Sequence, residues 1–224
     1  TSSTFHNISL DNSTSIPQNY VIVLTAELNN GCNDQDSILV TVNPAATAEF
    51  SYSGNSCSPA NILFTNNSNQ NTQAYWTFGD GANASVFEPS HIFSSPALTD
   101  TTYTVTLVTS NAFGCGDTIA QVININYSPQ ALASIDSLFG CYPLNAAISN
   151  LSQGASSYLW NFGNGVTSVN NATQFVFEYL NISNQIQTYP LSLTAIATNG
   201  CSSIWNSTVS VLPEVTAEAD LYVE

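Results

Sequence analysis

The side chains in this sequence that could bind a metal or transfer a proton near neutral pH are five cysteines, two histidines and 15 acidic residues, and the chain has no Lys or Arg. A hydrolase needs a nucleophile with a base, a pair of carboxylates or a metal, and the neutral bases are His6 and His91 alone. The acidic residues are scattered, and no pair of them recurs along the chain. We therefore predict that the chain is not an enzyme.

The composition excludes several classes of partner. The formal net charge is −15 and 7% of the residues are charged, whereas about a quarter of an average domain is charged. Without a cationic side chain the protein cannot neutralise phosphate groups, so we expect no nucleic acid partner. No apolar run approaches the ~20 residues of a membrane helix, so we expect no direct membrane insertion. A chain without any trypsin site suits an extracellular location.

The sequence repeats, with a period equal to the offset from Trp76 to Trp160. Trp76 begins the segment Trp-Thr-Phe-Gly-Asp-Gly, which contains Asp80, and Trp160 begins Trp-Asn-Phe-Gly-Asn-Gly, which contains Asn164. The cysteines form two sets with nearly the same period. The early cysteines, which precede the two tryptophans by equal distances in the sequence, are Cys57 and Cys141. The late cysteines, each at the same distance after a tyrosine (Tyr20, Tyr103 or Tyr189), are Cys32, Cys115 and Cys201. The repeat therefore defines the organisation of the chain.

The period divides the chain into four parts. Residues 1–43 contain only the second half of a repeat, 44–128 and 129–212 are complete repeats, and 213–224 are a linker and first strand of a further one. Short segments rich in β-branched residues alternate with Asn, Gly, Ser and Pro, and no window shows a helical stripe. About seven short strands per repeat, with cysteines and one Trp, predict an all-β fold of tandem immunoglobulin-like sandwiches in an extended array.

The motif Trp-x-Phe-Gly-Asp/Asn-Gly, followed by Pro-Ser-His-Ile-Phe at 89–93 and then Tyr-x-Val-x-Leu, resembles the PKD domain over nearly the whole chain. The second complete repeat departs from it, with Asn164 for the Asp and Phe177 where His91 stands. The resemblance implies a seven-stranded sandwich used in tandem on cell-surface proteins. The Asn- and Thr-rich, disulfide-bearing variety is similar to surface adhesins of gliding Bacteroidota, which are typically type IX secretion cargo.

The repeat also suggests how the cysteines pair. Nearly equal separations between an early and a late cysteine recur in register, which predicts the pairs Cys57–Cys115 and Cys141–Cys201. Each bond would contribute about 4 kcal/mol in the chain-entropy model. Cys32 is expected to be unpaired in this fragment. The alternatives are free buried thiols and metal binding, although no Cys-x-x-Cys spacing supports a metal.

The aspartates are candidate ligands for calcium. Asp80 lies in a Gly-Asp-Gly turn, where a carboxylate either accepts local backbone hydrogen bonds or binds Ca²⁺. Asp34, Asp36 and Asp117 near the late cysteines are the other candidates. No spacing resembles an EF-hand loop, so we expect either no cofactor or Ca²⁺.

Four Asp-Ser or Asp-Thr pairs resemble the O-glycosylation sequon of Bacteroidota. The acceptor candidates are Ser37, Thr101, Thr118 and Ser137. The alternative is that each pair only forms a turn.

The function predicted from these observations is that of a non-catalytic spacer in a long adhesin or surface filament, with neighbouring modules of the same chain as partners. One alternative is a module that binds glycans or other surface proteins through exposed aromatic residues. Its candidates are Tyr75, Phe87, Tyr142 and Tyr158. Another alternative is an accessory spacer of an extracellular hydrolase.

Overall fold

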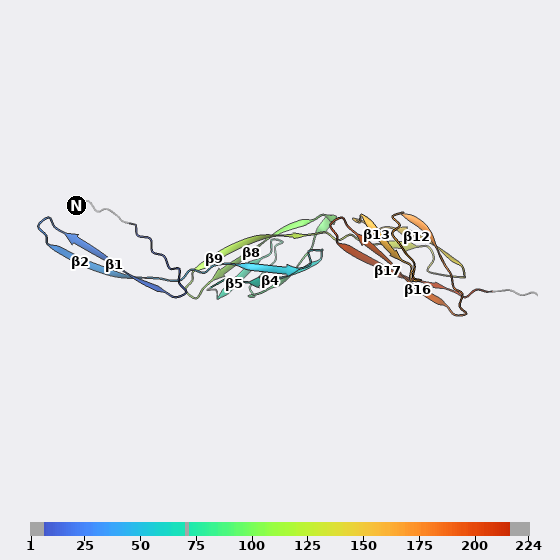
Figure 1. The fold of residues 1–224 in the computed structure, drawn as a ribbon, viewed down its shortest axis with the longest axis horizontal. Helices are drawn as coiled ribbons and strands as arrows, with labels where there is room; N and C mark the ends of the chain where they lie inside the picture. The colour runs from blue at the N-terminus through green and yellow to red at the C-terminus, as the bar shows by residue number, and fades with distance from the viewer. Residues whose placement is uncertain (1–6, 70–71, 216–224) are drawn as a thin grey trace, which may run out of the picture. The chain divides into compact units, whose positions relative to one another are not determined.

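The computed structural model of the protein describes residues 7–69 and 72–215, so His6 and most of 213–224 lie outside the described residues. Apart from one short 3₁₀ turn, η1 (Pro96–Leu98), every described element is a strand (Figure 1). The strands are β1 (Gln18–Glu27), β2 (Asn33–Val42), β3 (Phe50–Gly54), β4 (Ala60–Asn66), β5 (Gln73–Thr77), β6 (Asn83–Ala84), β7 (Ser90–Phe93), β8 (Thr101–Ser110), β9 (Gly116–Ile125), β10 (Ala133–Ile135), β11 (Phe139–Gly140), β12 (Leu144–Asn150), β13 (Ser157–Asn161), β14 (Thr167–Ser168), β15 (Gln174–Tyr179), β16 (Gln187–Ile196) and β17 (Ser202–Val211). The predicted all-β fold of tandem sandwich modules is confirmed.

The chain forms two compact units. Unit 1 takes the described residues of Thr1–Asn55, Asn61–Phe93 and Thr102–Asn124. Unit 2 takes those of Ser56–Ala60, Ser94–Thr101 and Ile125–Glu224. Three segments of the first complete sequence repeat, residues 56–60, 94–101 and 125–128, therefore belong to unit 2. The repeat boundaries stay a prediction, since they divide the sequence differently.

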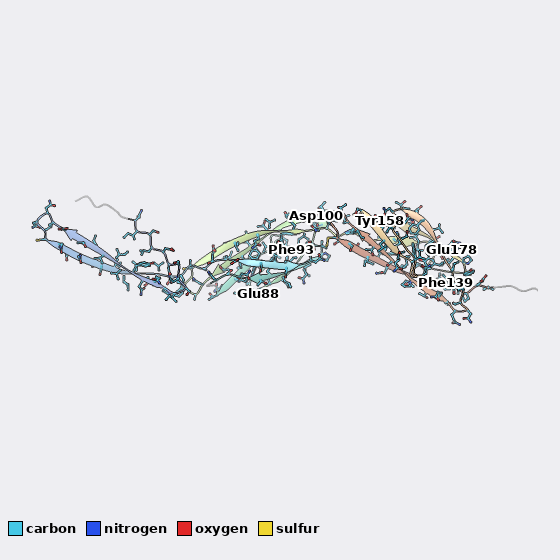
Figure 2. All side chains as sticks on the ribbon, in the orientation of Figure 1. Glu88, Phe93, Asp100, Phe139, Tyr158 and Glu178 are labelled. Carbon is cyan, nitrogen blue, oxygen red and sulfur yellow. A yellow bond between two sulfur atoms is a disulfide. The ribbon has the colours of Figure 1, made fainter. Side chains whose placement is uncertain are left out.

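Unit 1 contains a sandwich of two sheets, with strand orders β3-β4-β7 and β6-β5-β8-β9. Alternate residues of β4 and β8 face the space between the sheets, because successive side chains of a strand point to opposite faces. Trp76 is fully buried there, with its ring 5.1 Å from that of Phe50 and 5.5 Å from that of Phe64. Phe93, labelled in Figure 2, completes the core and is also fully buried.

Unit 2 repeats this architecture with sheets β10-β12-β15 and β11-β17-β16-β13-β14. Trp160, Tyr179 and Leu193 form its fully buried centre. Strand β11 pairs with the end of β17 in parallel, with Gly140 opposite Val211. The tryptophan of each repeat thus lies between the two sheets of one sandwich.

Strands β1 and β2 form a two-stranded sheet, with ten residue pairs from Gln18 opposite Val42 to Glu27 opposite Asn33. Leu24 stands four residues after Tyr20 and is 71% exposed. The leucines at the same distance after Tyr103 and Tyr189, which are Leu107 and Leu193, are fully buried. Among the described residues, no Trp-bearing strands cover this hairpin. No described helix is long and apolar enough to cross a membrane.

Candidate functional site

The disulfide that the structure records joins Cys57 to Cys201, 144 residues apart in sequence, with their Cα atoms 5.6 Å apart. Cys57 belongs to the short segment of unit 2 that precedes β4, and it forms an isolated parallel bridge with Asn126. Ser58 N donates to Asn126 O at 2.9 Å, and Asn126 N donates to Ser56 O at 2.8 Å. Cys57 is therefore held beside the point where the chain leaves β9.

Cys201 lies in the turn between β16 and β17, and its side chain is buried. The turn is closed by backbone hydrogen bonds, because Ala197 N donates to Cys201 O at 2.8 Å and Gly200 N donates to Ala197 O at 3.1 Å. Asn199 accepts from Cys201 N through its Oδ1 at 3.0 Å. One asparagine side chain thus fixes the backbone of the bonded cysteine.

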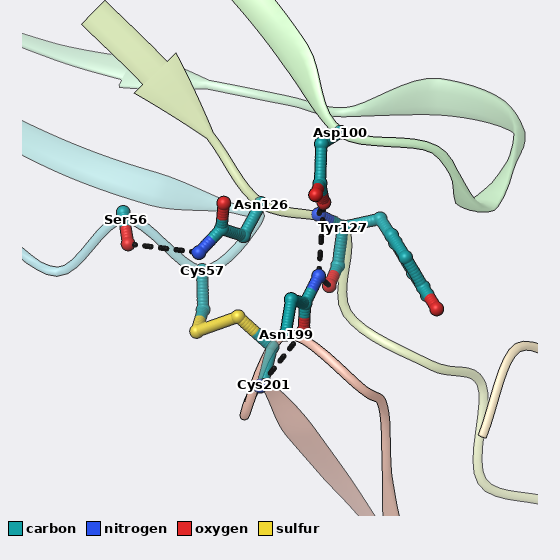
Figure 3. The surroundings of a disulfide bond; sticks show 7 residues. All are labelled: Ser56, Cys57, Asp100, Asn126, Tyr127, Asn199 and Cys201. Carbon is teal, nitrogen blue, oxygen red and sulfur yellow. Dashed lines mark hydrogen bonds between the residues drawn. A yellow bond between two sulfur atoms is a disulfide. The ribbon is translucent and has the colours of Figure 1, made fainter. Parts of the chain in front are cut away.

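The same asparagine ties the turn to two other segments of unit 2 (Figure 3). Asn199 Nδ2 donates to Asp100 Oδ1 at 2.9 Å and to Tyr127 O at 3.0 Å. Tyr127 N donates to the same oxygen of Asp100 at 3.0 Å. Hydrogen bonds to a carboxylate are stronger than neutral ones, so this network positions Cys201 independently of the disulfide.

The structure corrects the predicted pairing of Cys57 with Cys115. Cys115 stands immediately before β9, and Asn126 immediately after it. A ten-residue strand spans about 33 Å at ~3.3 Å per residue. Cys57 lies beside Asn126, at the opposite end of β9 from Cys115. The Cα atoms of Cys57 and Cys115 are therefore much farther apart than the separation of at most about 7 Å that a disulfide tolerates. Cys115 is a free thiol.

The predicted pair Cys141–Cys201 is corrected for the same reason. Gly140 pairs with Val211 at the end of β17, whereas Cys201 precedes the start of that strand. The length of β17 separates the two cysteines. Cys141 and Cys32 are free and exposed. The sequence did hold a signal for this outcome, since the long alternating strand that follows each late cysteine keeps it away from the early cysteine of its own repeat.

The Gly-Asp-Gly turn of the first complete repeat places Asp80 in contact with a histidine side chain. Asp80 Oδ2 lies 2.7 Å from Nε2 of the half-buried His91 on β7, and Asp80 Oδ1 accepts from Ala82 N at 3.0 Å. The ring of Phe78 stacks on that of His91, with centroids 4.2 Å apart and an interplanar angle of 4°. Gly79 has φ +84, and a Cβ there would lie 2.7 Å from Thr104 O, so the turn requires glycine.

The pKa of Asp80 reflects opposing effects. Burial raises it, but the hydrogen bonds from His91 and from the Ala82 backbone, together with the attraction of the imidazole, lower it below its ordinary value of 3.8. The ionised carboxylate is therefore the stable form. In the second complete repeat, Asn164 Oδ1 accepts from Val166 N at 3.1 Å without an ionic partner.

The other calcium candidates have separate local partners. Asp34 accepts from Gln35 N, Asp36 accepts from Ser37 N, and Asp117 Oδ2 accepts from Ala48 N at 2.8 Å. Hydrogen bonds from Ala48 and Thr118 lower the pKa of Asp117. Among residues 7–69 and 72–215, no three His, Cys, Asp or Glu side chains group as a metal site would require. Calcium binding stays a prediction.

The four glycosylation candidates differ in access. Ser37 on β2 and Thr118 on β9 are exposed. Thr101 is half-buried with its hydroxyl 3.2 Å from Ser95 Oγ, and the half-buried Ser137 donates from Oγ to Phe139 O at 3.0 Å. Ser37 and Thr118 are thus the candidates that an enzyme would reach in the folded protein.

The aromatic candidates for glycan binding also divide into two groups. Tyr142 and Tyr158 are half-buried and pack against the core of unit 2. Tyr75 and Phe87 are 44% and 48% exposed and line one hollow of unit 1 together with Val108. Tyr75 and Phe87 are thus the two aromatic candidates whose rings are exposed to solvent.

The comparisons with known proteins follow this geometry. The curated proteins give no match to the chain. Among solved structures, the PKD1 domain of the Vibrio cholerae metalloprotease PrtV is 26% identical, with a TM-score of 0.31, and the match covers 38% of this chain and 98% of that one. The PKD1 domain of Vibrio anguillarum Epp is 22% identical, with a TM-score of 0.32 and coverages of 38% and 99%. A Ca²⁺-stabilised adhesin of an Antarctic bacterium is 10% identical, with a TM-score of 0.35 and coverages of 87% and 56%. By family, residues 41–127 match the PKD domain.

Proposed function

We propose that the protein is a non-catalytic, load-bearing segment of a long extracellular adhesin or surface filament, in which tandem sandwiches hold a binding region away from the cell. The observation that carries this proposal is the Cys57–Cys201 disulfide. Cys57 belongs to one sequence repeat and Cys201 to the next. A covalent bond between consecutive repeats limits how far the chain extends under tension.

Two further observations support an extracellular surface location. Disulfides persist in oxidising compartments, and a chain without Lys or Arg offers no site to trypsin-like proteases. Export by type IX secretion in a gliding bacterium, and O-glycosylation at the exposed Ser37 and Thr118, belong to the same proposal. Intact-mass measurement of the native protein tests the glycosylation, because an unmodified mass contradicts it.

Single-molecule pulling at the two chain ends tests the load-bearing role. With the disulfide closed, the residues between Cys57 and Cys201 cannot contribute to the unfolded length. The Cys201→Ser variant should therefore release an additional length of about 500 Å, at ~3.6 Å per residue, for the 144-residue separation. Cys141→Ser, which leaves the bond intact, is the matched control. If the oxidised wild-type chain releases the same length as Cys201→Ser, the proposal loses its support.

A second candidate function is glycan binding at the hollow beside Tyr75 and Phe87. Exposed aromatic faces bury sugar rings by stacking, and both side chains line the same hollow. The hollow belongs to unit 1, whereas the disulfide that supports the spacer role belongs to unit 2. The same chain can therefore have both roles.

A glycan array tests this candidate directly. Binding should be lost in Tyr75→Ala and Phe87→Ala. It should persist in Phe113→Ala, which removes an aromatic side chain that is 49% exposed outside the hollow. Equal binding by all three variants and the wild type, or no binding by the wild type, rejects the glycan site.

A further inference from the structure

We propose that the free cysteines Cys115 and Cys141 each form the same kind of disulfide as Cys57–Cys201, with a cysteine of an adjoining sandwich repeat outside these 224 residues. The early cysteine of each repeat would bond the late cysteine of the repeat that follows it. This goes beyond the spacer role, because it assigns a chemically defined partner to each free thiol.

Cys141 occupies the same backbone position as the bonded early cysteine, Cys57. The carbonyl of Ser56, one residue before Cys57, accepts from Asn126 N at 2.8 Å at the end of β9. The carbonyl of Gly140, one residue before Cys141, accepts from Leu212 N at 2.8 Å at the end of β17. Cys141 is therefore held beside the exit of its repeat, as Cys57 is, and it is exposed there.

Cys115 occupies the same position as the bonded late cysteine. Cys201 N donates to Asn199 Oδ1 at 3.0 Å, and Asn199 Nδ2 donates at 3.0 Å to the carbonyl of Tyr127, the residue after Asn126. Cys115 N donates to Asn111 Oδ1 at 3.0 Å, and Asn111 Nδ2 donates at 2.9 Å to the carbonyl of Pro44.

Pro44 and Tyr127 are equivalent in the repeat, because each is two residues beyond the last residue of a strand, β2 or β9. The two asparagines stand at different distances from their cysteines, yet they make the same pair of bonds. Asn111 is itself buried. The turn that carries Cys115 is thus fixed against the end of the preceding repeat, where an early cysteine of that repeat would lie.

The cysteine spacing agrees with this arrangement. A separation of 144 residues applied to Cys141 reaches beyond residue 224, and applied backwards from Cys115 or Cys32 it reaches before residue 1. The rule therefore assigns an outside partner to the three cysteines that are free in this chain, and it leaves Cys57 and Cys201 to each other.

The bond forms by thiol–disulfide exchange. A thiolate attacks a low-molecular-weight disulfide such as oxidised glutathione, and the second cysteine thiolate displaces glutathione from the mixed disulfide. The two cysteines lose two protons and two electrons as the S–S bond forms. The oxidised glutathione takes them up and leaves as two molecules of the thiol.

The test supplies the missing repeat. Residues 1–214 are followed by a second copy of residues 129–224, which retains the full chain up to the linker. Cys32, Cys115 and the Cys141 of the copy are replaced by Ser, and Ser202→Thr marks the copy by mass. The four remaining cysteines are Cys57, Cys141, Cys201 and the Cys201 of the copy, which allow three connectivities. The protein is refolded with oxidised glutathione, alkylated and cleaved with chymotrypsin, because trypsin finds no site.

The expected result is Cys57 linked to Cys201, Cys141 linked to the Cys201 of the copy, and no alkylated thiol. Adding Cys141→Ser to the extended chain should leave one alkylated thiol, on the copy. If Cys141 bonds the Cys201 of its own repeat, forms a dimer or stays free while Cys57–Cys201 is closed, the inference is overturned. If Cys57–Cys201 is itself absent, the proposed load-bearing function fails together with the inference. The two failures are distinguishable, because Cys57–Cys201 stays closed when the inference alone fails.

A second extended chain tests Cys115. A copy of residues 44–128, marked by Thr118→Ser, is inserted between Ser128 and Pro129. Cys57 should then bond the Cys115 of the copy, and the Cys57 of the copy should bond Cys201. Retention of a bond between the original Cys57 and Cys201 contradicts the assignment of Cys115.

Discussion

The two complete repeats build the same aromatic stack from different chemistry. In the first, Phe78 stacks on His91 at 4.2 Å and 4°, and Asp80 pairs with the imidazole. In the second, Phe162 stacks on Phe177 at 3.8 Å and 5°. Phe177 takes the place of His91, and Asn164 takes that of Asp80, so the ring and its partner differ together. The comparison teaches that the fold requires a flat ring on the phenylalanine, whereas the charge is an addition of one repeat.

The largest expected effect is that of removing the disulfide, which should lower the stability of unit 2 but not that of unit 1. Cys201→Ser should destabilise unit 2 by up to about 5 kcal/mol, because a loop of this length is no longer closed in the unfolded chain. Unit 1 should retain its stability, since the bond lies in unit 2. Hydrogen exchange followed peptide by peptide measures each unit separately. Equal loss of protection in β5 and β13 would contradict this.

The next largest effect is the loss of stability expected when the tryptophan of one repeat at a time is replaced. Trp76→Ala and Trp160→Ala should each cost about 3–5 kcal/mol, because each leaves a large cavity in a buried core. The loss should stay in unit 1 for Trp76 and in unit 2 for Trp160. Denaturant unfolding monitored by the fluorescence of the remaining tryptophans measures it. A loss shared between both units would show that their cores are coupled.

A smaller effect is expected when the first repeat receives the residues that surround the aromatic stack of the second. The lowered pKa of Asp80 contributes stability that is present above its ordinary value of 3.8 and is lost as the pH falls through the lowered value. The double variant Asp80→Asn, His91→Phe gives the first repeat the residues of the second. It should fold and lose this part of the acid dependence of unit 1.

Asp117, whose pKa is also lowered, is present in both proteins, so the difference between their pH profiles isolates Asp80. The measurement is the urea midpoint of unit 1 between about pH 2 and pH 7, a range that spans ordinary carboxyl pKa values. Identical profiles would show that the contact between Asp80 and His91 does not contribute.

The smallest effect concerns Tyr179, which stands where the first repeat has Phe93. Both side chains are fully buried, and within the described part of the chain the Tyr179 hydroxyl has no hydrogen-bond partner. Burial raises the pKa of Tyr179 to about 12. Tyr179→Phe should therefore leave unit 2 as stable or raise its stability by about 1 kcal/mol. A destabilisation seen in thermal unfolding would reveal a partner for the hydroxyl.

The fold was predictable because the pattern of one repeat contains it. Alternating strands, one tryptophan and a glycine turn per repeat predicted sandwich modules, and the structure confirms them. The disulfide was not predictable from spacing alone, since Cys115 and Cys201 are equivalent in the repeat and either one fits the register of Cys57. Only the position of each cysteine relative to the ends of the neighbouring strands decides between a bond within a repeat and one to the next.

The partners of individual side chains were also beyond the sequence. Asp117 was a candidate ligand, yet it binds the backbone of Ala48, which is distant in the sequence. In the second repeat, Ser203 Oγ accepts from Ala131 N at 2.8 Å in the same way. A carboxylate and a hydroxyl therefore serve one purpose, which residue type alone does not reveal.

The bond between Cys57 and Cys201 makes a covalent ring of the chain between them. A single proteolytic cut anywhere within that ring opens it without releasing a fragment, because both new ends remain attached through the sulfur atoms. Two cuts are needed before material is lost. A chain closed in this way stays in one piece after a cut that would divide an ordinary polypeptide in two.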